Sequence, residues 1–253
     1  MNLMNAVLRH HKMVEDKEFE CVMTVLVGSQ NYKLDTENSD IDTFTFVLPS
    51  VDDLAYARDA AAGEFDAGDG KCMYKDVRVA LNLLKKTSPN SVECFVGEYR
   101  VYNPTYKDVL TYYLDDEMTV NKMVHCNYSH MLYAMAGMAH QLTKRNMPAG
   151  KRYAHSLRLM DMYSTFTSYT PTSLLLEMRP YTRNLAMVAK RDTNTDNDIF
   201  YNAECEMNAK TLDTLREVFS LTDEQKQFQT EGLTLIEELQ KELMQFYLKY
   251  MIK

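Results

Sequence analysis

Strand-like alternation of apolar and polar residues is confined to roughly the first hundred residues of this 253-residue chain. The clearest example is DIDTFTFVLPS, where Phe44 and Phe46 alternate with threonines and Pro49 ends the segment. From about residue 105 onward, the apolar spacing is helical almost to the end. The pattern predicts an α+β protein with a small mixed-sheet domain at 1–115, followed by a mostly α-helical domain at 116–253.

Local start and stop signals divide the chain further. The segments CVMTVLVGS and KCMYK have the apolar and β-branched content of strands. Asp76 is placed to begin a helix that continues to residue 86, and Ser88-Pro89-Asn90 breaks it. Other helices are predicted at residues 1–16, 51–65 and 223–253, and breaks in the helical part at 147–150, 169–172 and 191–198.

Composition excludes several classes of protein. We find no run of about 18 apolar residues, so no membrane span is expected. The N-terminal segment MNLMNAVLRHHK lacks the apolar core of an export signal. The five cysteines are scattered without CxxC spacing, which argues against a structural zinc site or a disulfide framework. We therefore expect a cytoplasmic protein that does not associate with membranes.

Charge is distributed unevenly along the chain, whose net charge is −8. Residues 1–120 carry 12 Lys/Arg and 21 Asp/Glu, a balance of −9, and residues 191–253 carry 7 and 13, a balance of −6. Residues 121–190 carry 9 Lys/Arg and only 2 Asp/Glu, a balance of +7. A basic segment between acidic flanks is typical of a surface that binds phosphate, although a Lys/Arg-rich helix face would give the same balance.

The segment VGSQNYKLDTENSDIDTFTF, residues 27–46, contains the most informative motif. Gly28 and Ser29 follow an apolar strand, where a glycine allows close approach to a phosphate and a helix starting there would direct free N–H groups at an anion. Asp40 and Asp42 are two residues apart at the start of the next strand, so their carboxylates point to the same side. Paired carboxylates of this kind suit Mg²⁺ together with triphosphate oxygens.

This Gly-Ser and Ser-Asp-x-Asp combination resembles the signature of nucleotidyltransferases of the DNA-polymerase-beta superfamily. SDIDTFTFVLPS is similar to the form found in a bacterial branch that includes the RNA-repair-pathway DNA-polymerase-beta family. DVRVALNLLKKTSPNSVECF resembles the helix, Asn-Pro-Asn turn and Glu-containing segment of that branch, with Ser88 in the first place of the turn. GKRYAHSLRL (150–159) and LLLEMRP (174–180) resemble its later segments, so the likeness covers roughly residues 25–180.

The resemblance implies roles for particular residues. Asp40 and Asp42 would be catalytic ligands of two Mg²⁺ ions, or of Mn²⁺, and Gly28, Ser29 and Ser39 would bind the nucleotide. The superfamily usually supplies a third carboxylate, as a further metal ligand, from a neighbouring strand. The candidates are Asp69, which we favour, and Asp76, whose position also fits a helix N-cap.

A basic helix is the second predicted part of the site. Lys151, His155 and Arg158 follow i, i+4, i+7 spacing and so share one helix face. This face is predicted to bind nucleotide, through the triphosphate or the base, or to contact an RNA backbone. The alternative is a solvated face with one buried histidine.

Together these features predict an NTP-dependent, pyrophosphate-releasing nucleotidyltransferase whose acceptor is an RNA 3′ end, such as that of tRNA. Three alternatives remain open. One is nucleotidylylation of a protein hydroxyl, of the kind found in toxin–antitoxin enzymes of the superfamily. The second, which the sequence favours less, is transfer to a small molecule such as an aminoglycoside. The third is a nucleic-acid-binding module without catalytic activity.

Overall fold

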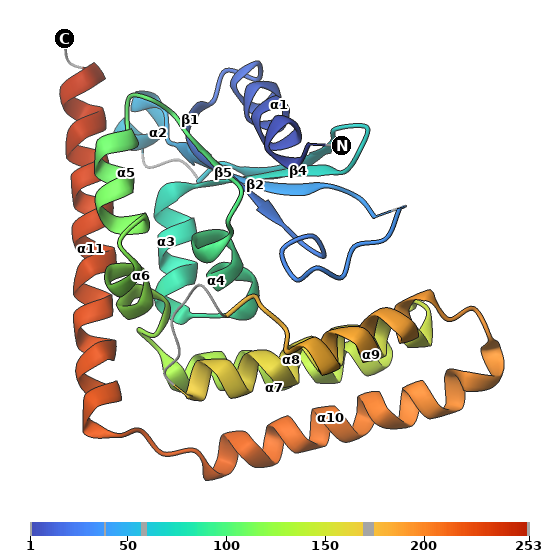
Figure 1. The fold of residues 1–253 in the computed structure, drawn as a ribbon. Helices are drawn as coiled ribbons and strands as arrows, with labels where there is room; N and C mark the ends of the chain where they lie inside the picture. Colours follow the sequence, from blue (N-terminus) through green and yellow to red (C-terminus); the bar gives the residue numbers. More distant parts are fainter. Residues whose placement is uncertain (1, 38, 57–59, 169–174, 252–253) are drawn as a thin grey trace.

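A five-stranded mixed sheet occupies the N-terminal half of the protein in the computed structural model, which describes residues 2–37, 39–56, 60–168 and 175–251 (Figure 1). The strand order is β3-β4-β2-β1-β5. The strands are β1 (Glu20–Val27), β2 (Asp42–Leu48), β3 (Ala62–Asp66), β4 (Lys71–Asp76) and β5 (Arg100–Tyr102).

The central pairings bring the ends of the predicted motif together. Strand β1 runs antiparallel to β2, with Val27 opposite Asp42, so the residues after β1 lie beside those that begin β2. Strand β4 runs parallel to β2, with Cys72 opposite Thr43. Strands β3 and β5 pair antiparallel with β4 and β1 and form the two edges of the sheet.

Helices cover both faces of the sheet (Figure 1). Helix α1 lies on one face, and α3 and α4 lie on the other. The helices before residue 105 are α1 (Leu3–Glu15), α2 (Val51–Ala55), α3 (Val77–Lys86) and α4 (Pro89–Val96). The later helices are α5 (Lys107–Leu114), α6 (Glu117–Val124), α7 (Tyr128–Lys144), α8 (Ala149–Thr167), α9 (Pro180–Arg191), α10 (Asp198–Val218) and α11 (Asp223–Met251), with a short 3-10 helix η2 (Thr195–Asn197) before α10.

Alternation along β2 gives the sheet two different faces. Thr43 and Thr45 point toward α1, where buried hydroxyls and histidines form hydrogen bonds; the Thr45 and Thr24 hydroxyls are 2.8 Å apart, and His11 Nδ1 is 2.8 Å from Thr24. Phe44 and Phe46 point the other way and belong to the large hydrophobic core. The face opposite α1 therefore offers an apolar surface, with Asp42 at its edge.

The predicted α+β class is confirmed, and the two parts share one core. The largest cluster of buried apolar residues extends from β1 through α11. Helix α11 packs back against α3, α5 and α6, while α7, α8, α9 and α10 pack against one another (Figure 1). The boundary predicted between residues 115 and 116 lies at the end of α5 and is bridged by this core.

Several predicted elements are confirmed, and one is wrong in part. The helices expected at 1–16, 76–86 and 223–253 correspond to α1, α3 and α11. The helix predicted at 51–65 ends at Ala55, and Ala62–Asp66 is instead the edge strand β3. Pairing with β4 outweighs the helical preference of its alanines. The break expected at 169–172 lies outside the described residues.

None of the helices in the described ranges combines the length and apolarity that spanning a membrane requires.

Candidate functional site

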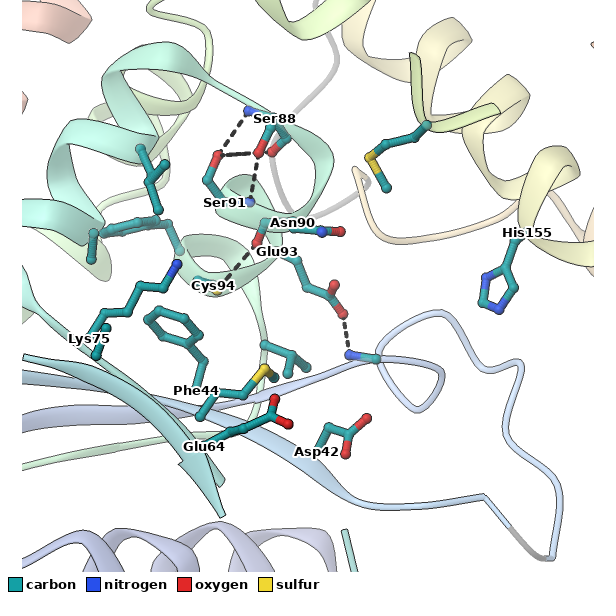
Figure 2. Close-up of a pocket in the computed structure, with 18 of the residues that line it drawn as sticks. Asp42, Phe44, Glu64, Lys75, Ser88, Asn90, Ser91, Glu93, Cys94 and His155 are labelled. Carbon is teal, nitrogen blue, oxygen red and sulfur yellow. Dashed lines mark hydrogen bonds between the residues drawn. The ribbon is translucent and has the colours of Figure 1, made fainter. Parts of the chain in front are cut away.

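A cavity of about 980 Å³ lies between the Phe44 face of the sheet and helices α3, α4, α7 and α8. Phe44, Phe46 and Met73 form an apolar floor on the sheet. Figure 2 shows Lys75 and His155 at opposite sides of the view, with Asp42 and Glu93 between them. The cavity therefore combines an apolar surface with a set of charged groups.

Gly28 brings the end of β1 against the start of β2. Its φ is +93°, in the region that favours glycine. A Cβ placed on Gly28 would lie 3.7 Å from Asp42 Oδ2, so the backbone and the carboxylate are close neighbours. Both residues line the cavity. The glycine and the second aspartate of the motif are therefore neighbours at the cavity.

Replacing Gly28 with alanine is expected to strain the backbone without a steric clash, because the nearest atom to the methyl group, Asp42 Oδ2, would be at an ordinary contact distance of 3.7 Å. A non-glycine residue with positive φ costs about 1–2 kcal/mol, which corresponds to a melting temperature roughly 2–8 °C lower. Gly68, with φ +86° and no neighbour within 4 Å, is the matched control for strain alone. Thermal melts of Gly28→Ala and Gly68→Ala test this, and an unchanged melt for Gly28→Ala would contradict the strain.

Asp42, the first residue of β2, lies on the cavity side of the sheet. Ile41 before it is buried against α1 with Ala6 and Val7, on the other side. Asp42 Oδ1 accepts the Lys71 backbone N–H at 3.0 Å, whereas no described residue donates a hydrogen bond to Oδ2. Asp40 is exposed and does not line the cavity.

Neither candidate for the third carboxylate reaches the cavity. Asp69 lies in the turn between β3 and β4, and its side chain faces α1, where it forms an ion pair with Arg9 and contacts His10 Nε2 at 2.8 Å. These contacts lower the pKa of Asp69 although burial opposes them. Asp76 is fully buried, caps α3 and pairs with Arg78, as expected for a helix N-cap.

Two other carboxylates line the cavity together with Asp42. Glu64, on β3, stands opposite Met73 of β4 and forms an ion pair with Lys71 at 2.8 Å. Glu93, on α4, is 4% exposed and accepts the Gly28 N–H at 2.6 Å (Figure 2). Neither carboxylate was predicted from the sequence, although Glu93 falls in the Glu-containing segment that carried part of the resemblance.

The two predicted serines do not contact the cavity. Ser29 opens a series of turns rather than a helix, and its carbonyl accepts the N–H groups of Tyr32 and Leu34. The Ser39 hydroxyl accepts the Thr36 N–H at 2.8 Å and so stabilises the loop before Asp40. Their described contacts are local to the connection between β1 and β2.

The basic face of α8 meets the cavity from the opposite side. His155 and Arg158 line it, and Lys151 lies exposed one turn earlier on the helix. Arg145, which follows α7, also lines the cavity and had not been predicted. Arg179 of the LLLEMRP segment is instead paired with the buried Asp161.

His155 is partly buried among cations, and both the burial and the positive charges disfavour its protonation. Burial lowers its pKa to about 3, helped by the charges of Arg158, Lys151, Lys190 and Arg145. The histidine is therefore neutral in the folded protein at pH values where an unfolded histidine, with a pKa of 6.5, becomes protonated.

A depressed histidine pKa contributes stability above pH 6.5 that is lost as pH falls toward 3. Between pH 7 and pH 5 we expect this residue to cost the wild type about 2 kcal/mol of unfolding free energy. His155→Gln removes this titration, so the variant should not lose this part of its unfolding free energy. The unfolding free energy of the wild type minus that of the variant should therefore be about 2 kcal/mol lower at pH 5 than at pH 7. Urea unfolding at both pH values measures it, and parallel pH profiles would contradict it.

A divalent cation at this cavity would need ligands from a substrate as well as from the protein. Within the described ranges, no three His, Cys, Asp or Glu side chains are grouped to form a metal site by themselves. Mg²⁺ commonly takes one or two carboxylates and completes its coordination with substrate phosphates and water. Asp42 supplies one such carboxylate at the cavity wall, with no hydrogen bond from a described residue to its Oδ2, whereas Asp40 lies exposed outside the cavity lining.

No family model and no curated protein matches this chain.

Proposed function

We propose that the protein is a metal-dependent nucleotidyltransferase that moves a nucleoside monophosphate from an NTP to an acceptor hydroxyl. One observation carries the proposal: a single cavity joins Gly28 and Asp42 of the motif to His155 and Arg158 of the basic helix. These groups are more than a hundred residues apart in the chain. An acidic metal-binding side opposite a cationic side is the arrangement that phosphoryl-group chemistry requires.

The groups of the motif and of the cavity each have a role in this proposal. Asp42 in the cavity, with the exposed Asp40 two residues before it, would hold Mg²⁺, which supplies charge stabilisation to the reacting phosphate when bound. Gly28, without a side chain, leaves room for a phosphate beside Asp42. The floor around Phe44 and Met73 offers an apolar surface for the base.

The reaction is a displacement at the α-phosphorus. A bond forms between the acceptor oxygen and the α-phosphorus as the bond to the leaving pyrophosphate breaks. The acceptor's proton needs a base, and Glu64 at the cavity wall is a half-exposed carboxylate able to take it.

An RNA 3′ end is the acceptor that we favour. Lys144, Arg145 and Lys151 are exposed around the turn between α7 and α8, and Arg145 also lines the cavity. A polynucleotide backbone that follows these side chains would deliver its terminal hydroxyl to the cavity.

Incubation with each α-labelled NTP and Mg²⁺, in the presence of total RNA or of a cell lysate, tests the proposal. Label in RNA that is absent with Asp42→Asn supports it. Label in a protein band would move the acceptor to a protein hydroxyl, and label in neither would overturn the proposed transfer.

A further inference from the structure

Arg158 carries a buried charge without a hydrogen-bonding partner. Its side chain lines the cavity although the residue is only 8% exposed. Its guanidinium stacks 4.2 Å from the ring centre of Tyr32, and Nε is buried with no hydrogen-bond partner. Within the described part of the chain, no group accepts a hydrogen bond from this guanidinium. Buried guanidinium groups are normally satisfied by acceptors, so this one is available to a ligand.

The buried acid Glu93 interacts electrostatically with Arg158 but accepts its hydrogen bonds from other residues. Glu93 Oε1 accepts hydrogen bonds from the Gly28 N–H at 2.6 Å and from Asn31 Nδ2 at 3.1 Å. Burial raises the pKa of Glu93, while the charge of Arg158 opposes that rise. No ion pair joins the two described side chains, so Glu93 balances the charge of Arg158 only in part.

Other cations surround the same end of the cavity. Lys190 of α9 donates to the Leu34 carbonyl, so its ammonium reaches across from the helical part to the loop after β1. Burial lowers the pKa of Lys190, and Lys151 adds to this effect. Four cationic side chains influence the single residue His155: Arg158, Lys151, Lys190 and Arg145. Asp35 offsets part of the charge of Lys190, and the positive charge that remains suits a counter-anion with several negative charges.

We propose that Arg158, with Lys190 and Lys151 beside it, forms a polyphosphate-binding site that holds the terminal phosphates of a nucleoside triphosphate. This assignment rests on the proposed function and changes which residues bind the terminal phosphates. The Gly28 N–H is occupied by Glu93, and Ser29 does not line the cavity, so phosphate recognition shifts from the loop after β1 to α8 and α9.

The burial of Arg158 favours a triphosphate over an RNA backbone at this position. A polynucleotide contacts cations along an open surface, whereas Arg158 lies inside the cavity behind the exposed Lys151. A terminal triphosphate reaches into a pocket, and a planar guanidinium matches two phosphate oxygens at once.

Calorimetric titration with inorganic tripolyphosphate in metal-free buffer tests this site without any transfer reaction. Arg158→Gln is expected to weaken tripolyphosphate binding about ten- to a hundredfold, the loss for charged hydrogen bonds. Arg216→Gln is the matched control, because Arg216 also stacks on a tyrosine, 5.4 Å from the Tyr133 ring centre, but lies outside the cavity lining. It should bind like the wild type.

Arg158→Lys keeps the positive charge but loses the two-pronged geometry of the guanidinium. It is the second test variant if the melting curve of Arg158→Gln shows that this protein does not fold. It should also bind less tightly. Wild-type affinity in the folded Arg158 variant, or no binding to the wild-type protein, would overturn the site. If the Arg158 variant binds tripolyphosphate normally but loses affinity for an RNA oligonucleotide, the triphosphate assignment is wrong and the ligand of this site is RNA. If tripolyphosphate binding depends on Arg158 but the wild-type protein shows no nucleotide transfer, the binding site is supported and the proposed function is overturned.

Discussion

Asp42→Asn is expected to reduce nucleotide transfer by at least about a hundredfold, because even residues that only support metal ligands cost up to that factor. Asparagine has the same shape, and its oxygen can still accept the Lys71 N–H that Asp42 Oδ1 accepts. The substitution therefore removes negative charge from the position beside Gly28 while preserving the start of β2. Initial rates with a labelled NTP, compared with the melting temperature of the same samples, separate lost chemistry from lost folding.

Asp69→Asn provides the matched control for Asp42→Asn. Its carboxylate pairs with Arg9 and contacts His10 on the opposite face of the sheet. We therefore expect this variant to lose some stability and to retain transfer within a few-fold of the wild type. If Asp42→Asn were fully active and Asp69→Asn inactive, the active site would lie on the α1 face of the sheet and not at the cavity.

Local pattern was sufficient to predict the two central strands of the fold, from the apolar run of β1 and the alternation in β2. The antiparallel pairing of these strands was not predicted, and turns follow Gly28 where a helix had been expected. Antiparallel pairing then makes Gly28 and Asp42 neighbours, as the register of Val27 with Asp42 shows. Gly28 and Asp42 belong to one short segment of the chain, so a local sequence motif was enough to identify both residues.

The remaining carboxylates depend on tertiary pairing and could not be predicted in the same way. Ala60, Ala61 and Ala62 favour a helix, yet Ala62–Asp66 becomes an exposed edge strand through its pairing with β4. That pairing places Glu64 at the cavity and leaves Asp69 in the turn that follows β3. Which face a turn residue points to is decided by its partners, here Arg9 and His10, and not by its spacing.

The spacing of the basic helix correctly grouped His155 with Arg158 on one helix face, but their environment comes from distant segments. Tyr32 stacks on Arg158 from the loop after β1, and Lys190 approaches from α9. Helical periodicity identifies residues that share a face, but it does not distinguish a solvated face from one that lines a cavity.

The close packing of α8 on α9 leads to the second prediction with a large expected effect. A Cβ on Gly150, in the first turn of α8, would lie 1.9 Å from the Ala189 carbonyl oxygen. The obstacle is backbone, so α9 would have to move away by about 1 Å or more to restore normal contact. Gly150→Ala is therefore expected to destabilise the protein by about 1–3 kcal/mol or more, the cost of overpacking a buried contact.

Gly137→Ala is the matched control, because it makes the same substitution in a helix. Gly137 lies within α7 with no atom within 4 Å of an added Cβ, so alanine should stabilise the protein by up to about 1 kcal/mol through its helix propensity. Opposite shifts in chemical denaturation are the expected result, and equal shifts would contradict the close approach of the helices. Because Ala189 directly precedes Lys190, Gly150→Ala should also weaken tripolyphosphate binding in the fraction that remains folded, whereas Gly137→Ala should leave that binding unchanged.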